Sequence, residues 1–247
     1  MIHLKKTLTV IKNSINNFLL IFGYKISKSN TSSDLVKLYK YKDYKEYKET
    51  QIYYNKQKIN KVWADETTLE TISNFLKEKI KSNLIRGICH GSRNGFEQNF
   101  FNNETEGFEV IGTDISETAK NYKNSYVHDF HEEKKEWLEY YDFVYSNSLD
   151  QSYDPKKALD TWLKQVKLGG FVIIEHSDQH GVLSSGKMDP FGVESNFFPY
   201  LLAEWFGHSI SIQIIKCIKK NKKPLKSRAF VGKNINAFLF ILKKIKN

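Results

Sequence analysis

Residues 84–116 contain two short apolar runs, and the segment between them constrains the fold of this chain more than any other stretch. The first run ends at Cys89, Gly91 and Gly95 bracket a polar turn, and the second run ends on Asp114. The runs predict buried strands, and the segment after Gly95 predicts the start of a helix. This order predicts a βαβ unit that holds a nucleoside, because glycine lets the backbone approach a ligand and the helix offers free N–H groups beside it. Asp114 would accept hydrogen bonds from two ribose hydroxyls.

Apolar runs and helical stripes continue to alternate along the rest of the chain, which predicts an α/β domain. At 247 residues, the chain can bury a sizeable core. The expected strands are 84–89, 109–114, 125–130, 141–148, 171–175, 209–217 and 236–242, and the expected helices are 62–81, 116–122, 195–206 and one that carries Leu159, Trp162, Leu163 and Val166. Asp65 is the expected N-cap of the helix over 62–81, a turn is expected at 167–170, and residues 188–192 are expected to form a loop.

The glycine turn, Gly91-Ser92-Arg93-Asn94-Gly95, does not match the G-x-G-x-x-G pattern of dinucleotide-binding proteins. It resembles a variant of motif I of the class I S-adenosylmethionine-dependent methyltransferases. The stretch YDFVYSNSLDQSYDP at 141–155, the helix after it and VKLGGFVIIE at 166–175 resemble motif IV, its helix and the glycine turn that follows in that family. The resemblance covers residues 84–176. Cys89 stands where the family usually has an acid, so another group must contact the amino group of the methionine.

The resemblance implies a Rossmann-like, seven-stranded, mostly parallel sheet with a terminal antiparallel strand pair and added N-terminal helices. It divides the chain into an N-terminal helical and basic extension, 1–61, and a methyltransferase domain, 62–247. The cofactor implied is S-adenosylmethionine, with Asp114 at its ribose and Asp129 at the exocyclic amine of its adenine. The implied cofactor-binding residues are His90, Gly91, Arg93, Asn94, Gly95, Asp114, Ile115, Asp129, Phe130, Ser146, Asn147 and Ser148.

The segments HGSRNG, GTDIS, SNSLD and DPFG together also resemble a subgroup found among bacterial surface-polysaccharide methyltransferases. That resemblance implies O-methylation of a sugar hydroxyl or phosphate-type group on a nucleotide-linked or glycan precursor. An Asn-Pro-Pro-Tyr type of motif, used for methylation of amide or adenine nitrogen, is absent, and Ser146–Leu149 stands in its place. This absence favours oxygen over nitrogen as the methyl acceptor.

His176 and His180 follow the fifth predicted strand, at the edge where active sites of open α/β sheets lie. We expect His176 to be the general base, with His180 in reserve, and Asp150 to orient an imidazole or the acceptor hydroxyl. One alternative is that His176 only bonds backbone at the strand end. Another is a divalent metal, Mg²⁺ or Mn²⁺, held by Asp150, His176, Asp178 or His180, which we rank below the base because carboxylates do not dominate the set. No metal site is therefore predicted.

The net charge of +10 is concentrated at the two ends of the chain. Residues 1–30 contain five basic residues and residues 216–247 contain eleven, with no acid in either segment, so residues 31–215 carry −6. An acidic middle argues against a core that wraps nucleic acid. The basic ends predict an anionic small-molecule or glycan acceptor, or peripheral contact with an anionic membrane. An RNA methyltransferase, favoured by the lysine-rich loop 219–233, and a non-catalytic nucleoside-binding protein at the membrane remain alternatives.

An apolar stripe over residues 4–22 predicts an N-terminal helix. Polar residues interrupt it too often for a membrane span or a signal peptide, so a cytoplasmic protein is expected. The helix would pack on its own domain, on a second copy in a homodimer, or on the inner face of a membrane. Residues 31–61, rich in Lys and Tyr, are expected to be exposed, partly helical and a flap over the site. Cys89 and Cys217 give no disulfide framework, and a reducing compartment fits.

Overall fold

A computed structural model describes residues 35–220 and 235–246. The predicted helix over 4–22 and residues 221–233 of the lysine-rich loop lie outside these ranges. All described residues belong to one compact unit, which includes residues 35–61 of the predicted N-terminal extension. Within the described ranges, no helix has the length and apolar character needed to cross a bilayer.

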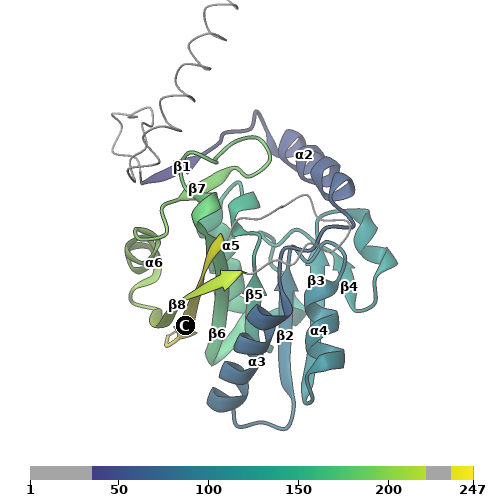
Figure 1. The fold of residues 1–247 in the computed structure, drawn as a ribbon, viewed down its shortest axis with the longest axis vertical. Helices are drawn as coiled ribbons and strands as arrows, with labels where there is room; N and C mark the ends of the chain where they lie inside the picture. Colours follow the sequence, from purple (N-terminus) through teal and green to yellow (C-terminus); the bar gives the residue numbers. More distant parts are fainter. Residues whose placement is uncertain (1–34, 221–234, 247) are drawn as a thin grey trace, which may run out of the picture. The chain divides into compact units, whose positions relative to one another are not determined.

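A seven-stranded sheet forms the centre of the molecule, in the order β4-β3-β2-β5-β6-β9-β8 (Figure 1). The first five strands in this order are parallel, and β9 runs antiparallel between β6 and β8. The strands are β2 (Ile85–His90), β3 (Phe108–Asp114), β4 (Ser125–Val127), β5 (Tyr141–Ser146), β6 (Val166–Ser177), β8 (Ile210–Lys220) and β9 (Ile235–Lys244). The predicted Rossmann-like sheet with a terminal antiparallel pair is confirmed.

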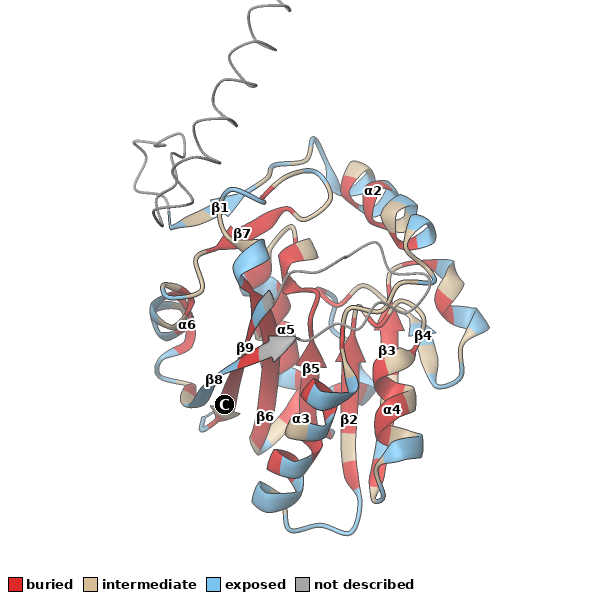
Figure 2. Ribbon diagram, viewed as in Figure 1, coloured by how far each residue is buried: buried red, intermediate tan, exposed pale blue. Residues whose placement is uncertain are grey.

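Helices cover both faces of the sheet because successive strand residues point to opposite sides. On β2, Ile88 packs with α5 (Pro155–Gln165) and α6 (Phe198–Phe206), whereas its neighbour Cys89 packs with α3 (Glu66–Lys79) and α4 (Phe96–Glu104). Figure 2 shows the strands as mostly buried between these layers. The core is therefore two apolar clusters separated by the sheet.

Side-chain caps start two of these helices. The Asp65 carboxylate accepts a 2.8 Å hydrogen bond from the Thr68 N–H at the start of α3, which confirms the predicted cap. The Asp154 carboxylate accepts one from the Lys157 N–H, and Pro155 occupies the first turn of α5. In the part of the chain that the structure describes, four short 3₁₀ helices lie in the connections: η1 (Glu117–Asn121), η2 (Lys135–Trp137), η3 (Leu149–Gln151) and η4 (Asp178–His180).

The structure differs from the predicted elements in four places. The helix expected at 116–122 is the 3₁₀ helix η1, and β4 ends before Asp129, which lies in the following loop. The turn expected at 167–170 is part of β6, where Gly169 has φ +84° and the pairing with β5 is irregular. Phe191 and Gly192, expected in a loop, belong to strand β7 (Phe191–Val193), which pairs antiparallel with β1 (Val36–Leu38).

Between β1 and α3 lies the helix α2 (Tyr44–Gln57), which confirms the expected partly helical character of residues 31–61. The 182–190 loop holds α2 from one side. Tyr41, just before the helix, donates a 2.6 Å hydrogen bond to the Lys187 carbonyl, and Gln51 donates one of 3.1 Å to the Met188 carbonyl. The pair β1–β7 and this loop thus attach α2 to the rest of the domain.

Candidate functional site

Two adjoining cavities lie at the carboxyl ends of the parallel strands. The strand order reverses between β2 and β5, which is where open α/β sheets bind ligands. The first cavity is lined by Tyr47, Gln51, Tyr54, Asn55, Lys58, Gly91, Arg93, Asp114, Ile115, Asp129, Phe130, Gln151 and Met188. The second, of about 310 Å³, is lined by Lys58, Lys61, Val62, Trp63, Arg93, Asn147, Ser148, Asp150, Gln151, Gln179, His180, Met188 and Asp189. Four of these residues are common to both cavities.

The glycine turn follows β2 and forms part of the first cavity. Gly91 has φ +69°, and a Cβ on it would lie 2.6 Å from the Cβ of Ser148. Gly95 has φ +76° and is the N-cap of α4. A side chain at Gly91 would thus be strained and would collide with the loop after β5. Both predicted glycines are required by the backbone.

Asp114 ends β3, as predicted, and lines the first cavity. It is only 7% exposed, and one carboxylate oxygen accepts a hydrogen bond from the Ser116 N–H while the other accepts from the Arg93 N–H. Burial raises the pKa of this carboxyl above its usual value. Each oxygen has a second lone pair, so the carboxylate can also accept hydrogen bonds from a diol in the cavity.

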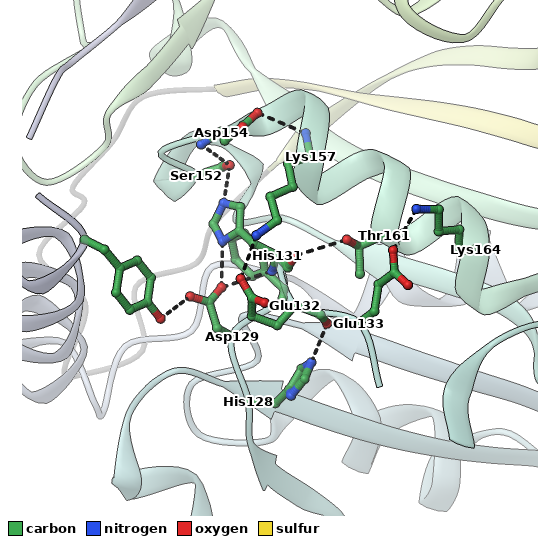
Figure 3. A network of polar contacts seen from close by, with 12 residues as sticks. His128, Asp129, His131, Glu132, Glu133, Ser152, Asp154, Lys157, Thr161 and Lys164 are labelled. Atoms are coloured by element: carbon green, nitrogen blue, oxygen red, sulfur yellow. Dashed lines mark hydrogen bonds and ion pairs between the residues drawn. The ribbon is translucent and has the colours of Figure 1, made fainter. Parts of the chain in front are cut away.

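Asp129 also lines the first cavity, but its oxygens are engaged by protein groups (Figure 3). One oxygen lies 2.6 Å from His131 Nδ1, and the other accepts a 2.7 Å hydrogen bond from the Tyr44 hydroxyl. Burial acts to raise the pKa of Asp129, but the hydrogen bond and charge of His131 outweigh it and lower the pKa to about 2. Asp129 is therefore an ionised anchor for α2 as well as a wall of the cavity.

His131 continues this network to Ser152, whose hydroxyl lies 2.6 Å from Nε2 (Figure 3). An Asp–His–Ser chain has the connectivity of a catalytic triad. Ser152 is 0% exposed and lines neither cavity, and its oxygen also accepts the Asp154 N–H at the start of α5. The hydrogen bonds of Asp129, His131 and Ser152 therefore hold the loops after β4 and β5 in position, and they do not present a nucleophile to either cavity.

The other predicted cofactor residues are divided between the cavities and the core. Ile115 and Phe130 line the first cavity, and Asn147 and Ser148 line the second. The Ser146 hydroxyl donates to the His90 carbonyl, and Ser146 lines neither cavity. Asn94 and Gly95 line neither cavity as well.

The His90 side chain points away from the cavities. It is 1% exposed, lies 2.8 Å from the Thr113 hydroxyl and 2.7 Å from Gln165 Oε1, and stacks on Trp162. Burial lowers the pKa of His90 to about 3. A neutral imidazole in the core on the α5 side cannot offer its ring to a ligand in these cavities.

His176 is likewise a core residue and lines neither cavity. It is 4% exposed, its Nε2 lies 2.9 Å from the Val193 carbonyl oxygen, and its ring packs against Phe198 and Phe240. Burial lowers the pKa of His176 to about 3. This arrangement matches the alternative in which His176 bonds backbone at the strand end, and it does not favour a proton-transfer role.

His180 and Asp150, in contrast, both line the second cavity and lie beside each other there. His180 Nε2 lies 3.6 Å from Asp150 Oδ2, and the His180 ring lies 5.3 Å from that of Trp63. Asp150 is 6% exposed, and burial raises its pKa to about 7. Where Asp150 is ionised, the imidazole beside it can take a proton from a ligand, because the carboxylate stabilises the resulting imidazolium.

The alternative of a metal site has no geometric support in the described residues, which contain no group of three or more His, Cys, Asp or Glu placed to hold an ion. Asp178 is turned toward other partners, because its oxygens accept hydrogen bonds from Ser195 and Asn236.

Glu97 is a buried acid in the first turn of α4, close to Cys89 of β2. Burial raises the pKa of the Cys89 thiol, and the charge of Glu97 raises it further. One Glu97 oxygen accepts a 3.2 Å hydrogen bond from Asn147, and the other has no partner among the described residues. Burial raises the pKa of Glu97 to about 7. Glu97 thus supplies an acid near the position at which Cys89 replaces one.

Most residues that the sequence analysis missed come from α2 and the segments beside it. Tyr47, Gln51, Tyr54, Asn55 and Lys58 line the first cavity. The expected flap identified this segment but no individual residue, because the Tyr spacing is not periodic. Lys61, Trp63, Gln179, Met188 and Asp189 in the second cavity were missed as well. Of these, only Asp189 belongs to a segment used in the resemblance, DPFG.

The architecture is shared with solved structures of methyltransferases. One is 1,6-didemethyltoxoflavin-N1-methyltransferase from Burkholderia thailandensis, solved with 1,6-didemethyltoxoflavin and S-adenosylhomocysteine (TM-score 0.61, 12% identity, 84% of this chain and 93% of that chain). Another is geranyl diphosphate C-methyltransferase from Streptomyces coelicolor A3(2) (TM-score 0.57, 10% identity, 80% of this chain and 98% of that chain). The fold is that of the class I S-adenosylmethionine-dependent methyltransferases. No protein-family model and no curated protein matches the sequence.

This methyltransferase fold is also that of the [4+2]-cyclase SpnF (TM-score 0.53, 9% identity, 72% of this chain and 81% of that chain). One fold therefore supports different reactions, and the reaction of this chain must be argued from its own site.

Proposed function

We propose that the chain is an S-adenosylmethionine-dependent methyltransferase. The observation that carries this proposal is the position of Asp114, a buried carboxylate at the end of β3 that borders the first cavity beside the glycine turn. A carboxylate there suits the two hydroxyls of a ribose, and Ile115 and Phe130 give apolar surface for a purine. The residues present therefore fit the nucleoside part of the cofactor.

When bound, S-adenosylmethionine supplies an activated methyl group. The protein has to hold an acceptor oxygen in line behind that methyl group, which is a task of positioning. The second cavity adjoins the first and shares Lys58, Arg93, Gln151 and Met188 with it, so an acceptor in the second cavity would lie next to the cofactor.

His180 is the proposed general base. A hydroxyl in the second cavity would give its proton to the His180 imidazole as its oxygen takes up the methyl group that the bound cofactor would supply. Asp150, 3.6 Å from Nε2, would stabilise the imidazolium. Glu97 is the proposed acid on the side of the methionine amino group. It lines neither cavity, so it would act through Asn147, which donates a hydrogen bond to it and lines the second cavity.

The proposed acceptor is a sugar hydroxyl or phosphate-type group of a nucleotide-linked or glycan precursor of surface polysaccharide. The HGSRNG, GTDIS, SNSLD and DPFG segments support this class through their resemblance, and the lysines of the second cavity suit an anionic acceptor. The proposed location is the cytoplasm, with peripheral contact to an anionic membrane through the basic ends.

Two measurements test the proposal. Calorimetry of the purified chain with S-adenosylhomocysteine should give saturable binding, and labelled S-adenosylmethionine should then transfer its methyl group to a member of a panel of nucleotide-sugars and glycan phosphates. Absence of binding by the folded protein would overturn the proposed cofactor. Transfer to RNA alone would replace the glycan acceptor by the nucleic-acid alternative.

A further inference from the structure

The short connection between α2 and α3 forms one wall of the second cavity. Within it, Lys58, Lys61, Val62 and Trp63 all line that cavity. The connection therefore brings two cations and one large aromatic ring to the place where the acceptor is proposed to bind.

Hydrogen bonds hold this connection in one shape. The Lys61 N–H donates to the Lys58 carbonyl at 2.8 Å, so the two lysines stand at the ends of one tight turn. The Arg93 guanidinium donates to the Lys61 carbonyl at 3.1 Å, and the Asn94 amide donates to the Ile59 carbonyl at 2.9 Å. Arg93 and Asn94, predicted as cofactor contacts, thus use their side chains to fix the lysine turn against the glycine turn.

The two lysines have no counter-charge of their own in the described chain, where neither ammonium group makes an ion pair. Lys58 is partly buried, and burial lowers its pKa, although Asp189 and Asp150 act on it in the opposite direction. Of the two acids in the cavity, Asp150 is paired with His180, and burial raises the pKa of Asp189 to about 6. With Arg93, the cavity contains three cations against two acids.

We propose that Lys58 and Lys61 bind a phosphate group of the methyl acceptor, and that Trp63 packs against the ring that carries this phosphate. The proposal deepens the proposed function, because it names the acceptor class of the same site. Lysine binds phosphate as a point charge, and a partly buried cation gains more from an anion than an exposed one does. The Trp63 ring, 5.3 Å from that of His180, borders the base on the same side of the cavity.

The carboxylate of the cofactor is the rival occupant of the lysine turn. The two cases differ when S-adenosylhomocysteine is already bound, because its carboxylate would then fill the turn and exclude phosphate. Phosphate that binds together with S-adenosylhomocysteine would occupy a separate subsite.

The experiment titrates glucose 1-phosphate and inorganic phosphate into protein saturated with S-adenosylhomocysteine, at constant ionic strength, by calorimetry. We expect saturable binding of both probes, weakened about tenfold or more by Lys58→Gln or by Lys61→Gln. Lys56→Gln is the matched control, since Lys56 is an exposed residue of the last turn of α2 and lines neither cavity. Trp63→Leu should weaken binding of glucose 1-phosphate and leave that of inorganic phosphate unchanged.

Affinity for S-adenosylhomocysteine, measured on every variant, separates this proposal from the proposed function and checks folding. Failure of both probes to bind the loaded wild type, competition with S-adenosylhomocysteine, or equal loss in the Lys56→Gln control would overturn the phosphate subsite. If S-adenosylhomocysteine itself fails to bind, the probes are titrated into the free protein. Lysine-dependent binding there would support the subsite while contradicting the proposed cofactor.

Discussion

The Tyr44 hydroxyl donates a 2.7 Å hydrogen bond to Asp129, and this bond joins the start of α2 to the loop after β4. Farther along α2, Asn55 accepts a 2.9 Å hydrogen bond from the Thr118 hydroxyl. On the other side, Glu46 pairs with Lys187 at 3.0 Å. The helix α2 is therefore fastened to the domain along both sides, and it lies above the strand ends (Figure 1). We therefore expect these contacts to open when a nucleoside enters or leaves the first cavity.

Removal of one fastening should speed ligand exchange. In Tyr44→Phe, the ring remains and the hydrogen bond to Asp129 is lost, so we expect S-adenosylhomocysteine to dissociate about fivefold faster in stopped-flow measurements. Tyr53→Phe is the control, because Tyr53 is exposed on α2 and lines neither cavity. An unchanged dissociation rate in Tyr44→Phe would show that α2 does not limit release.

Asp114→Asn should weaken binding of S-adenosylhomocysteine by roughly 1–3 kcal/mol, because a neutral amide replaces the charged acceptor proposed for the ribose hydroxyls. Calorimetry gives the affinity directly. Glu109→Gln changes an exposed acid on the same strand and should leave the affinity unchanged. Equal affinities for wild type and Asp114→Asn would remove Asp114 from the binding site.

The two histidines near the end of β6 should behave differently. His180→Gln should lower turnover about 10²–10⁴-fold with the identified acceptor, since it removes the proposed base, while affinity for S-adenosylhomocysteine stays the same. His176→Gln should keep turnover close to that of wild type and lower the free energy of unfolding, because His176 bonds backbone in the core. The reverse pattern would restore His176 as the general base.

Buried neutral histidines should make the protein sensitive to acid. The pKa of His176 is about 3 in the folded chain and about 6.5 in an unfolded one, so between these values only the unfolded state binds the proton. His176 therefore costs stability as the pH falls from 6.5 toward 3, by up to about 1.4 kcal/mol per pH unit. His90 should act in the same way.

The measurement compares the free energy of unfolding of wild type and His176→Gln by urea titration at several pH values. The free energy of unfolding must be compared between wild type and the variant at each pH, because other groups also titrate. Glu97 and Asp150, with pKa values raised to about 7, favour the folded state at low pH in both proteins. The advantage of wild type over the variant should shrink as the pH falls below 6.5. A difference that does not change with pH would mean that His176 is not held neutral.

The basic ends of the chain should give peripheral attachment to anionic membranes, with each lysine near the surface contributing about 1 kcal/mol. Residues 1–30, 221–234 and 247 of these ends lie outside the described ranges, and the prediction depends on the charge of the ends alone. Flotation at low salt should recover more protein with anionic vesicles than with neutral ones, and added salt should remove the difference. Equal recovery of protein with both kinds of vesicle would contradict membrane attachment. The apolar stripe over residues 4–22 would then be expected to pack on protein.

The order of elements and the strand ends could be predicted from the sequence, because each depends on a local pattern. Strand, glycine turn and acid gave the position of Gly91 and Asp114 correctly. The orientation of side chains at the strand ends was harder to judge. His90 is two residues after Ile88, and His176 is two residues after Ile174, so both histidines continue the apolar face that packs on α5 and α6.

Part of the second cavity could not be predicted in the same way, because several of its walls come from segments with no motif. Lys61 and Trp63 reach it from the α2–α3 connection, whose backbone accepts hydrogen bonds from Arg93 and Asn94. Met188 and Asp189 reach it through the loop before β7, whose partner β1 lies at the other end of the domain sequence. Pairings of this range leave no local pattern to detect.

The hydrogen bond from Tyr41 to Lys187 joins residues 146 positions apart, and the β1–β7 pair closes the chain over a similar span. Contacts at such separation form late during folding, since the entropy of closing a long loop is lost before the contacts repay it. The central sheet can assemble first from neighbouring βαβ units, and α2 docks onto it afterwards. A folding chain would thus acquire its scaffold before its ligand cavities. Ligand binding would then detect only molecules in which α2 has already docked.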